Sequence, residues 1–157
     1  MDPTLTQELA QLQTAHAVST PAARLRLIKQ RLACAAAEAG PSRLVITVAA
    51  VEALARSLVV HSSGRPASTA AMRYTQFRHA GPVELVEEVL RLRGVPEAAL
   101  HFTGDTWQLF ELANQYRNLV VHECTTLGND SYPPLISAAE QVFQNMVELA
   151  GLPRAVA

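Results

Sequence analysis

Apolar residues recur at helical spacing along almost the whole chain, and this periodicity is the strongest constraint on the fold. Steps of three and four residues between apolar side chains are typical of amphipathic helices, and they run from residue 5 to residue 149 with few interruptions. No segment shows the convincing alternation of apolar and polar residues that a half-buried strand has. The β-branched run at 45–48 is ambiguous, but its apolar continuation to residue 58 favours a helix. The sequence therefore predicts an all-α fold.

Proline and glycine residues divide this pattern into five or six helices. Proline suits the first turn of a helix, and glycine often ends one. Asp2–Pro3 and Thr20–Pro21 therefore mark two helix starts, and Gly40–Pro41 ends the second helix. The predicted helices cover residues 3–16, 21–39, 42–60, 83–92, 105–124 and 133–149.

Polar residues predict how two of these helices begin. Ser42 is a suitable N-cap for the third helix. Asp105, with Gln108 three residues later, resembles a capping box for the fifth. The stretch 62–81 starts with serine, glycine and proline and loses the helical spacing, so we expect a loop there. The predicted architecture is an up-and-down helical bundle formed by a single domain, residues 1–157.

The third predicted helix is apolar nearly all round, which indicates a central position in the bundle. Its apolar stretch at 44–60 is shorter than about 18 residues and contains Glu52 and Arg56, so we expect no membrane span. Near the N-terminus, Asp2 and Glu8 interrupt any apolar run of the kind that a signal peptide needs. We therefore expect a cytoplasmic protein.

The charge, the cysteines and the missing sequence motifs exclude several classes of function. The formal net charge is −1, so any contact with nucleic acid must be local. Cys34 and Cys124 form no C-x-x-C pair, which favours a reducing compartment, and we expect both to be buried. Because zinc-ligand spacings, Gly-rich phosphate loops and dinucleotide fingerprints are missing, we predict no metal site and no cofactor.

The most informative polar group lies late in the fifth predicted helix, where Arg117 and Asn118 precede His122. Asn118 and His122 are four residues apart and therefore share a helix face. Arg117 lies about 140° from His122 at roughly 100° per residue, but its long side chain can reach the same pocket. An arginine can bind a phosphate, and a histidine can transfer protons near neutral pH. The alternative is that both cations only favour the helix C-terminal dipole.

Glu52 and Arg56 form a second polar pair, four residues apart in the third predicted helix. A glutamate that precedes an arginine at this spacing commonly forms an intrahelical ion pair, which is the simpler interpretation. In a central helix, however, Glu52 can also face a neighbouring helix. There it would orient Arg117 or His122 in a shared pocket.

A third group of polar residues makes the stretch between the third and fourth predicted helices basic. It contains Arg65, Arg73 and Arg78, with Tyr74 and Phe77 between them. Arginines can hold phosphates while an aromatic ring stacks on an unpaired base. If the chain contacts RNA, as the family resemblance described below implies, Arg65, Arg73, Arg78 and Tyr74 are the candidate contacts. The alternative is a solvated crossover without a binding role.

The run from Arg117 to His122 resembles the motif of the HEPN superfamily, in which an arginine and a polar residue precede a histidine late in an all-α bundle. The segment 49–58, with Glu52 among apolar neighbours, also resembles the HEPN helix that carries an acidic residue. The resemblance covers roughly residues 20–149. The motif is short, and its place on the penultimate helix is what makes it informative.

This resemblance implies a metal-independent endoribonuclease of a toxin–antitoxin or phage-defence system. It implies a two-fold homodimer in which both motifs meet in one cleft. His122 would transfer protons at the ribose 2′-hydroxyl or the leaving oxygen, and Arg117 would bind the scissile phosphate. Asn118 would position the motif, Glu52 would steer Arg117 or His122, and the product would carry a 2′,3′-cyclic phosphate. RNA and a cognate antitoxin or other partner protein are the implied partners.

Two other functions stay open at this point. HEPN domains also include non-catalytic modules that bind a partner protein, RNA or a nucleotide, and then Arg117 and His122 would be interface or structural residues. A metal-dependent enzyme on a helical bundle is the other alternative. The chain lacks the Glu-x-x-His pairs that such bundles use.

Overall fold

The computed structural model describes residues 2–62, 66–126 and 128–152, and these residues form an all-helical fold without a strand. The predicted fold class is therefore confirmed. The α-helices are α1 (Pro3–Val18), α2 (Pro21–Cys34), α3 (Gly40–Val60), α4 (Ala70–Phe77), α5 (Pro82–Leu92), α6 (Ala98–His101), α7 (Thr106–Glu123) and α8 (Tyr132–Leu149), with short 3₁₀ helices at Ala67–Thr69 and Asn129–Ser131.

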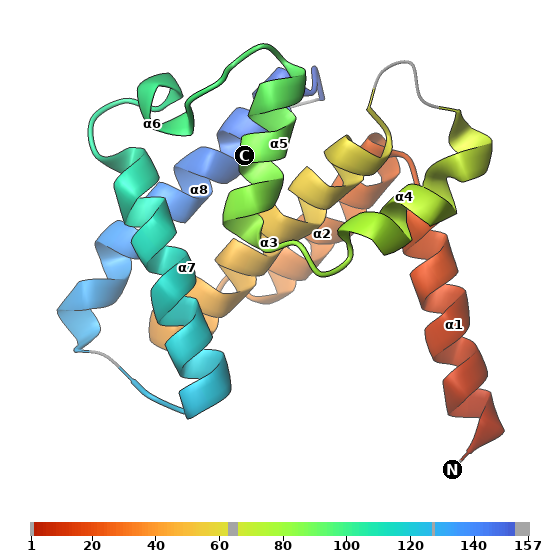
Figure 1. Cartoon of the computed structure of the whole chain (residues 1–157). Coiled ribbons are helices and arrows are strands. Elements are labelled where there is room, and N and C mark those ends of the chain that lie inside the picture. The colour runs from red at the N-terminus through yellow and green to blue at the C-terminus, as the bar shows by residue number, and fades with distance from the viewer. Residues whose placement is uncertain (1, 63–65, 127, 153–157) are drawn as a thin grey trace.

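Helix α3 lies at the centre of the bundle, as its apolar circumference predicts (Figure 1). Helices α2, α5, α7 and α8 all pack against it, and α7 also packs against α8. Several of its large apolar side chains, among them Leu44, Val51 and Leu54, are completely buried. Full burial of one such side chain stabilises the fold by about 1.5–3 kcal/mol, so α3 is the helix on which the others depend.

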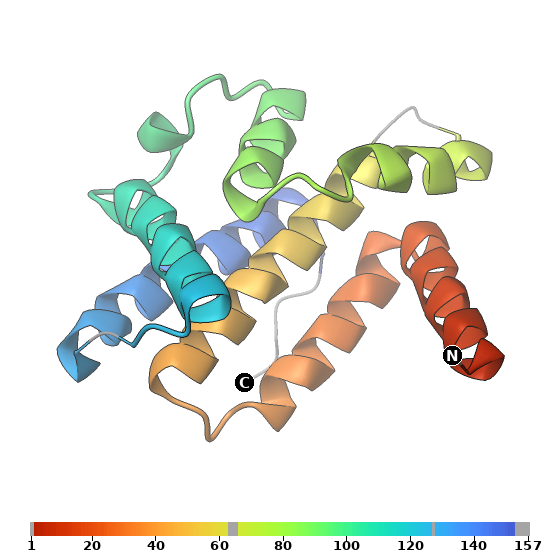
Figure 2. The ribbon, with the colours of Figure 1, turned by 60° about the horizontal axis from the view of Figure 1, so that its bottom comes forward.

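One side of α3 stays partly uncovered. The residues on this side recur at steps of three and four, which places them along one line of the helix. They are Ser42, Val45, Ile46, Ala49, Glu52, Ala53 and Arg56, and all are partly or fully exposed. We call these seven residues the open strip. Helix α2 flanks α3 on one side of the bundle and α7 crosses it on the other (Figure 2).

The first turns of helix α7 pack into the core, and its last turns are exposed. Trp107, Phe110 and Ala113 are buried in the core, and the Trp107 ring stacks on Phe102 with 5.5 Å between the ring centroids. Beyond Ala113 the described side chains of α7 are all partly or fully exposed. The turns that carry Arg117 and His122 therefore project from a firmly packed base.

Helix α1 projects from the rest of the molecule and packs against α4 (Figure 1). Its Asp2 side chain accepts a hydrogen bond from the Thr4 amide, as the cap before Pro3 predicts. Leu5, Leu9 and Leu12 follow at helical spacing, yet each is more than half exposed. Among the described helices, none combines the length and the apolar character needed to cross a membrane.

Two predicted caps are corrected by the structure. Helix α3 starts at Gly40, with Ala39 as the N-cap residue, so Ser42 lies inside the first turn. The fixed backbone of Pro41 suits that turn and lets the helix begin upstream. Asp105 is the N-cap residue of α7, but its side chain makes no capping hydrogen bond. The proposed capping box with Gln108 is therefore absent.

The described part of 62–81 is not a loop throughout, because it contains a 3₁₀ turn and α4. Ala70 is buried there and Phe77 packs against the core, so tertiary contacts stabilise a helix that the local pattern does not show. Together with the short α6, α4 brings the described α-helices to eight rather than five or six.

The cysteines also differ from their prediction, since Cys34 and Cys124 are both exposed. Cys34 is the last residue of α2, and Cys124 directly follows α7. Both helices end at the surface, so the cysteines at these ends are not enclosed. Cys124 adopts a left-handed conformation with φ of 51°, and its amide caps α7 by donating to the Leu119 carbonyl.

Candidate active site

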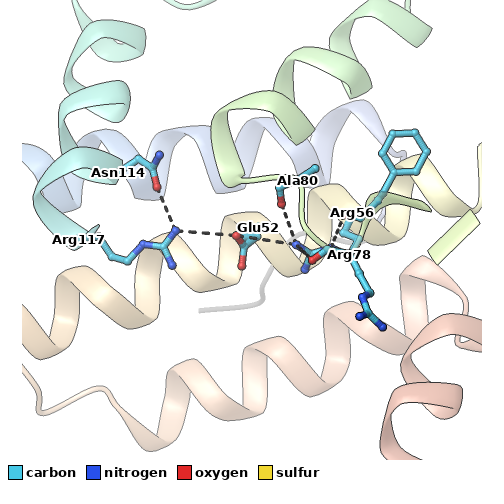
Figure 3. A network of polar contacts seen from close by, with 7 residues as sticks. Glu52, Arg56, Arg78, Ala80, Asn114 and Arg117 are labelled. Atoms are coloured by element: carbon cyan, nitrogen blue, oxygen red, sulfur yellow. Dashed lines mark hydrogen bonds and ion pairs between the residues drawn. The ribbon is translucent and has the colours of Figure 1, made fainter. Parts of the chain in front are cut away.

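Arg117 lies on the side of α7 that faces α3, and 17% of its side chain is exposed. Its Nη2 atom donates a hydrogen bond of 3.0 Å to Oδ1 of Asn114, one turn earlier on α7. The same Nη2 atom lies 3.9 Å from Oε1 of Glu52 on the open strip (Figure 3). Two helices that are far apart in the sequence thus bring a guanidinium and a carboxylate together.

Glu52 is shared between Arg117 and a second arginine. Its Oε1 atom lies 3.8 Å from Nη2 of Arg56, one turn further along α3. The guanidinium of Arg56 is also fixed by backbone carbonyls between α4 and α5, which accept hydrogen bonds of 3.0–3.5 Å (Figure 3). These acceptors belong to Phe77, Arg78 and Ala80. Both interpretations of Glu52 therefore describe real contacts, one within α3 and one to α7.

The group carries more positive than negative charge. Two guanidiniums face one carboxylate, so one positive charge lacks a counter-charge within this network. In addition, Nε of Arg117 is buried and has no hydrogen-bond partner. A buried donor without a partner costs about 1–3 kcal/mol. An anion with several oxygens, such as a phosphate, would supply both the negative charge and the missing acceptor.

Asn118 and His122 lie on another side of α7 from Arg117. Both side chains are exposed, in agreement with their spacing of four residues. Arg117 instead points toward α3, where its guanidinium contacts Asn114 and Glu52. The structure of one chain therefore brings Glu52 to Arg117 and does not bring His122 to either of them.

A groove runs along the open strip between α2 and the end of α7. It has two adjoining hollows of about 500 Å³ and about 180 Å³, which share Arg31 and Ile46 in their walls. The larger hollow lies beside the last turn of α7 and is lined in part by Val120 and Cys124. The smaller hollow lies between α2 and α3 over Ala49 and Ala53. Glu52 is next to Ala53 in the sequence and belongs to the same strip of α3, but it lines neither hollow.

The guanidinium of Arg73, a candidate RNA contact, donates hydrogen bonds to the chain's own backbone. Only 7% of the residue is exposed. Its Nε donates a hydrogen bond of 2.6 Å to the Val60 carbonyl at the end of α3, and Nη2 donates one of 3.0 Å to the Pro66 carbonyl. Its Nη1 donates to the Thr69 hydroxyl. Arg73 thus ties the end of α3 to the start of α4, which leaves it no accessible donor edge for RNA.

The other candidate RNA contacts have different surroundings. Arg65 lies outside the described residues. Tyr74 is half-buried and Arg78 is exposed, and both line a hollow of about 570 Å³ between α1 and α4. Nε of Arg78 donates to Nε2 of His79 at 3.1 Å. Tyr74 and Arg78 are therefore accessible at the end of the bundle next to Arg56.

Sequence reasoning missed two parts of this region. Asn114 precedes Arg117 by three residues, a spacing that places the two on one helix face and was an available signal. Arg24 and Arg31 line the smaller hollow from α2, and each lies within an ordinary amphipathic pattern. Their exposure along the groove follows from how α2 packs on α3, which the local sequence does not encode.

Comparison of the chain with models of protein families, with curated proteins and with solved structures found no match. Within the part of the chain that the structure describes, no three His, Cys, Asp or Glu residues cluster as a metal site would require. Function must therefore be argued from the geometry of the groove and its charges.

We expect Arg73→Met to destabilise the fold by about 3 kcal/mol, because it leaves buried acceptors at Val60 and Pro66 without a charged donor. Urea denaturation followed by circular dichroism measures this loss. Arg78→Met is the matched control on the same segment, and its exposed side chain should change stability by less than about 0.5 kcal/mol. An Arg73→Met protein that is as stable as the wild type but binds RNA more weakly would return Arg73 to the RNA contacts.

Proposed function

We propose that the chain is a metal-independent endoribonuclease of HEPN type, with Arg117 as its phosphate-binding group. The observation that carries this proposal is the contact between Arg117 and Glu52, together with the buried, unpartnered Nε of Arg117. A carboxylate holds the guanidinium on the side of α7 that faces α3, and its buried Nε has no acceptor within the described structure. The resemblance of the Arg117–His122 run to the HEPN motif supports the same assignment. A role as a toxin or phage-defence effector is part of this proposal.

The proposed reaction is an internal phosphoryl transfer. His122 takes the proton from the ribose 2′-hydroxyl, and the 2′-oxygen attacks the adjacent phosphorus. The bond from phosphorus to the 5′-oxygen of the next nucleotide breaks, and that oxygen takes a proton from water. The products are a 2′,3′-cyclic phosphate and a 5′-hydroxyl. Arg117 stabilises the negative charge that accumulates on the phosphoryl oxygens in the transition state.

The site is proposed to be completed by a second copy of the chain. Arg117 points toward Glu52, whereas His122 is exposed on another side of α7, so the two groups do not meet within one copy. Leu112 and Leu119 are also exposed on α7, at 41% and 42%. They offer an apolar surface on the His122 side of α7 that a second copy of the chain would cover.

We expect Arg117→Ala and His122→Ala each to lower RNA cleavage by about 10²–10⁴-fold in the presence of EDTA, with unchanged circular dichroism. Labelled single-stranded and structured RNAs, resolved on gels with analysis of the 3′ ends, measure the effect. Arg93→Ala, an exposed arginine at the end of α5, is the matched control and should cleave like the wild type.

Two outcomes would contradict this assignment. Normal cleavage by both variants would remove Arg117 and His122 from the mechanism. A wild-type protein that cleaves no RNA but binds one protein in a stoichiometric complex would favour the non-catalytic interaction module.

We expect Glu52→Gln to lower the cleavage rate by roughly tenfold, because Arg117 loses the charge that positions it. The same substitution should not lower further the residual rate of Arg117→Ala. Single-turnover rates of the four proteins form a double-mutant cycle that measures this coupling. Glu84→Gln on α5 is the matched control. Equal effects of Glu52→Gln in both backgrounds would show that Glu52 acts on the fold rather than through Arg117.

We expect a mixture of Arg117→Ala and His122→Ala proteins, unfolded and refolded together, to recover part of the wild-type cleavage rate. A site that combines groups from two copies regains one intact Arg/His pair in the mixed dimer. Cleavage assays and analytical ultracentrifugation measure activity and assembly on the same samples. A mixed dimer without recovered activity would show that both groups act from one chain.

A further inference from the structure

The smaller hollow of the groove is an apolar slot with an arginine near each end. Its volume is about 180 Å³. Aliphatic side chains of α2 form one wall, and the small residues Ala49 and Ala53 of α3 leave the space open. Arg24 and Arg31 line the slot from α2. They are seven residues apart, so they lie on one side of the helix about 10 Å apart along its axis.

The two arginines lack acidic partners in the described part of the chain. Neither Arg24 nor Arg31 has a carboxylate within ion-pair distance there, and no acidic residue lines the slot. Burial lowers the pKa of Arg24, the neighbouring Tyr74 opposes this shift, and the positive charge of Arg56 adds to it. Arg24 in turn lowers the pKa of His16, in addition to the effect of burial. Arg24 therefore lies in a region of positive charge, with no carboxylate of its own in the described part of the chain.

The slot adjoins the larger hollow beside the end of α7. The two hollows share Arg31 and Ile46. The open strip carries Glu52, which contacts both Arg56 and Arg117. The slot therefore lies along the same strip of α3 as the acidic partner of Arg117, although neither Glu52 nor Arg117 lines either hollow.

We propose that this groove binds single-stranded RNA, with one unstacked base in the apolar slot and Arg24 and Arg31 on the phosphates to either side. The inference rests on the proposed ribonuclease function and specifies its substrate as unpaired RNA. In a single-stranded nucleic acid, each base has flat, apolar faces and lies between two negatively charged phosphates. In a duplex the bases are stacked and paired and cannot enter such a slot.

RNA binding to the His122→Ala protein tests this proposal without interference from cleavage. The probe is a short fluorescein-labelled single-stranded RNA of mixed sequence, and anisotropy gives its affinity over a series of salt concentrations. Loss of one phosphate contact lowers the slope of log affinity against log salt by about 0.7 for a single strand. We expect Arg24→Gln and Arg31→Gln each to lower the slope by about this amount.

Two further variants separate charge from shape. Arg26→Gln removes a charge of the same kind from an exposed position on α2 outside the slot, and it should leave the slope unchanged. Ala53→Leu fills the slot without a change of charge, so it should weaken binding by about tenfold and keep the slope. Duplex RNA of the same sequence should bind more weakly, and the Ala53→Leu change should not affect its affinity.

The outcomes distinguish this proposal from the ribonuclease assignment. If the wild type cleaves RNA while Arg24→Gln, Arg31→Gln and Ala53→Leu bind like their parent, the groove proposal fails and the ribonuclease stands. If no RNA is cleaved but binding depends on these residues as described, the groove proposal stands and the catalytic assignment fails. Absence of binding at micromolar protein, or equal slopes for Arg26→Gln and Arg24→Gln, overturns the groove proposal.

Discussion

The burial of α3 is the constraint on which the rest of the structure depends. Its apolar residues extend around most of the helix, so α2, α5, α7 and α8 must cover it. Uncompensated charge in a core is costly, and the charged residues Glu52 and Arg56 accordingly lie on the side left partly open. The same packing that covers α3 places the end of α7 beside that side. The position of the candidate site is therefore a consequence of how the core closes.

The helices of this core could be predicted from the sequence because they bury one face at regular spacing. α5 and α8 follow that rule, and the start of α8 was correctly predicted from Pro133–Pro134. Pro41 was predicted to end the second helix, but it lies in the first turn of α3. The spacing of apolar residues does not show whether another helix covers the apolar face of a helix. In α1, Leu5, Leu9 and Leu12 follow the spacing but are exposed. Helix α4 escaped prediction for the opposite reason. It is stabilised by Arg73, whose acceptors include the end of α3, so its stability depends on contacts outside its own sequence.

The candidate site was predictable in part for similar physical reasons. A charged residue in an apolar helix needs a partner, and this indicated that Glu52 could reach beyond α3 to Arg117. The direction of the Arg117 side chain was not predictable, because an arginine can turn toward several faces of its helix. In the structure, Asn114 and Glu52 draw it toward α3 and away from the face of His122. The burial of Arg73 was likewise not predictable, because it depends on carbonyls at Val60 and Pro66 that accept from its guanidinium.

The two arginines on Glu52 differ in how firmly they are held, and this difference assigns their roles. Arg56 donates to three backbone carbonyls as well as facing Glu52, so moving it would leave several acceptors without a donor. Arg117 has one hydrogen bond to Asn114, a shared carboxylate at 3.9 Å and an unpartnered Nε. Under the proposed function, a phosphate at Arg117 would compete with fewer existing contacts than a phosphate at Arg56. Arg56 therefore fixes the position of Glu52, and Arg117 is the arginine free to respond to a ligand.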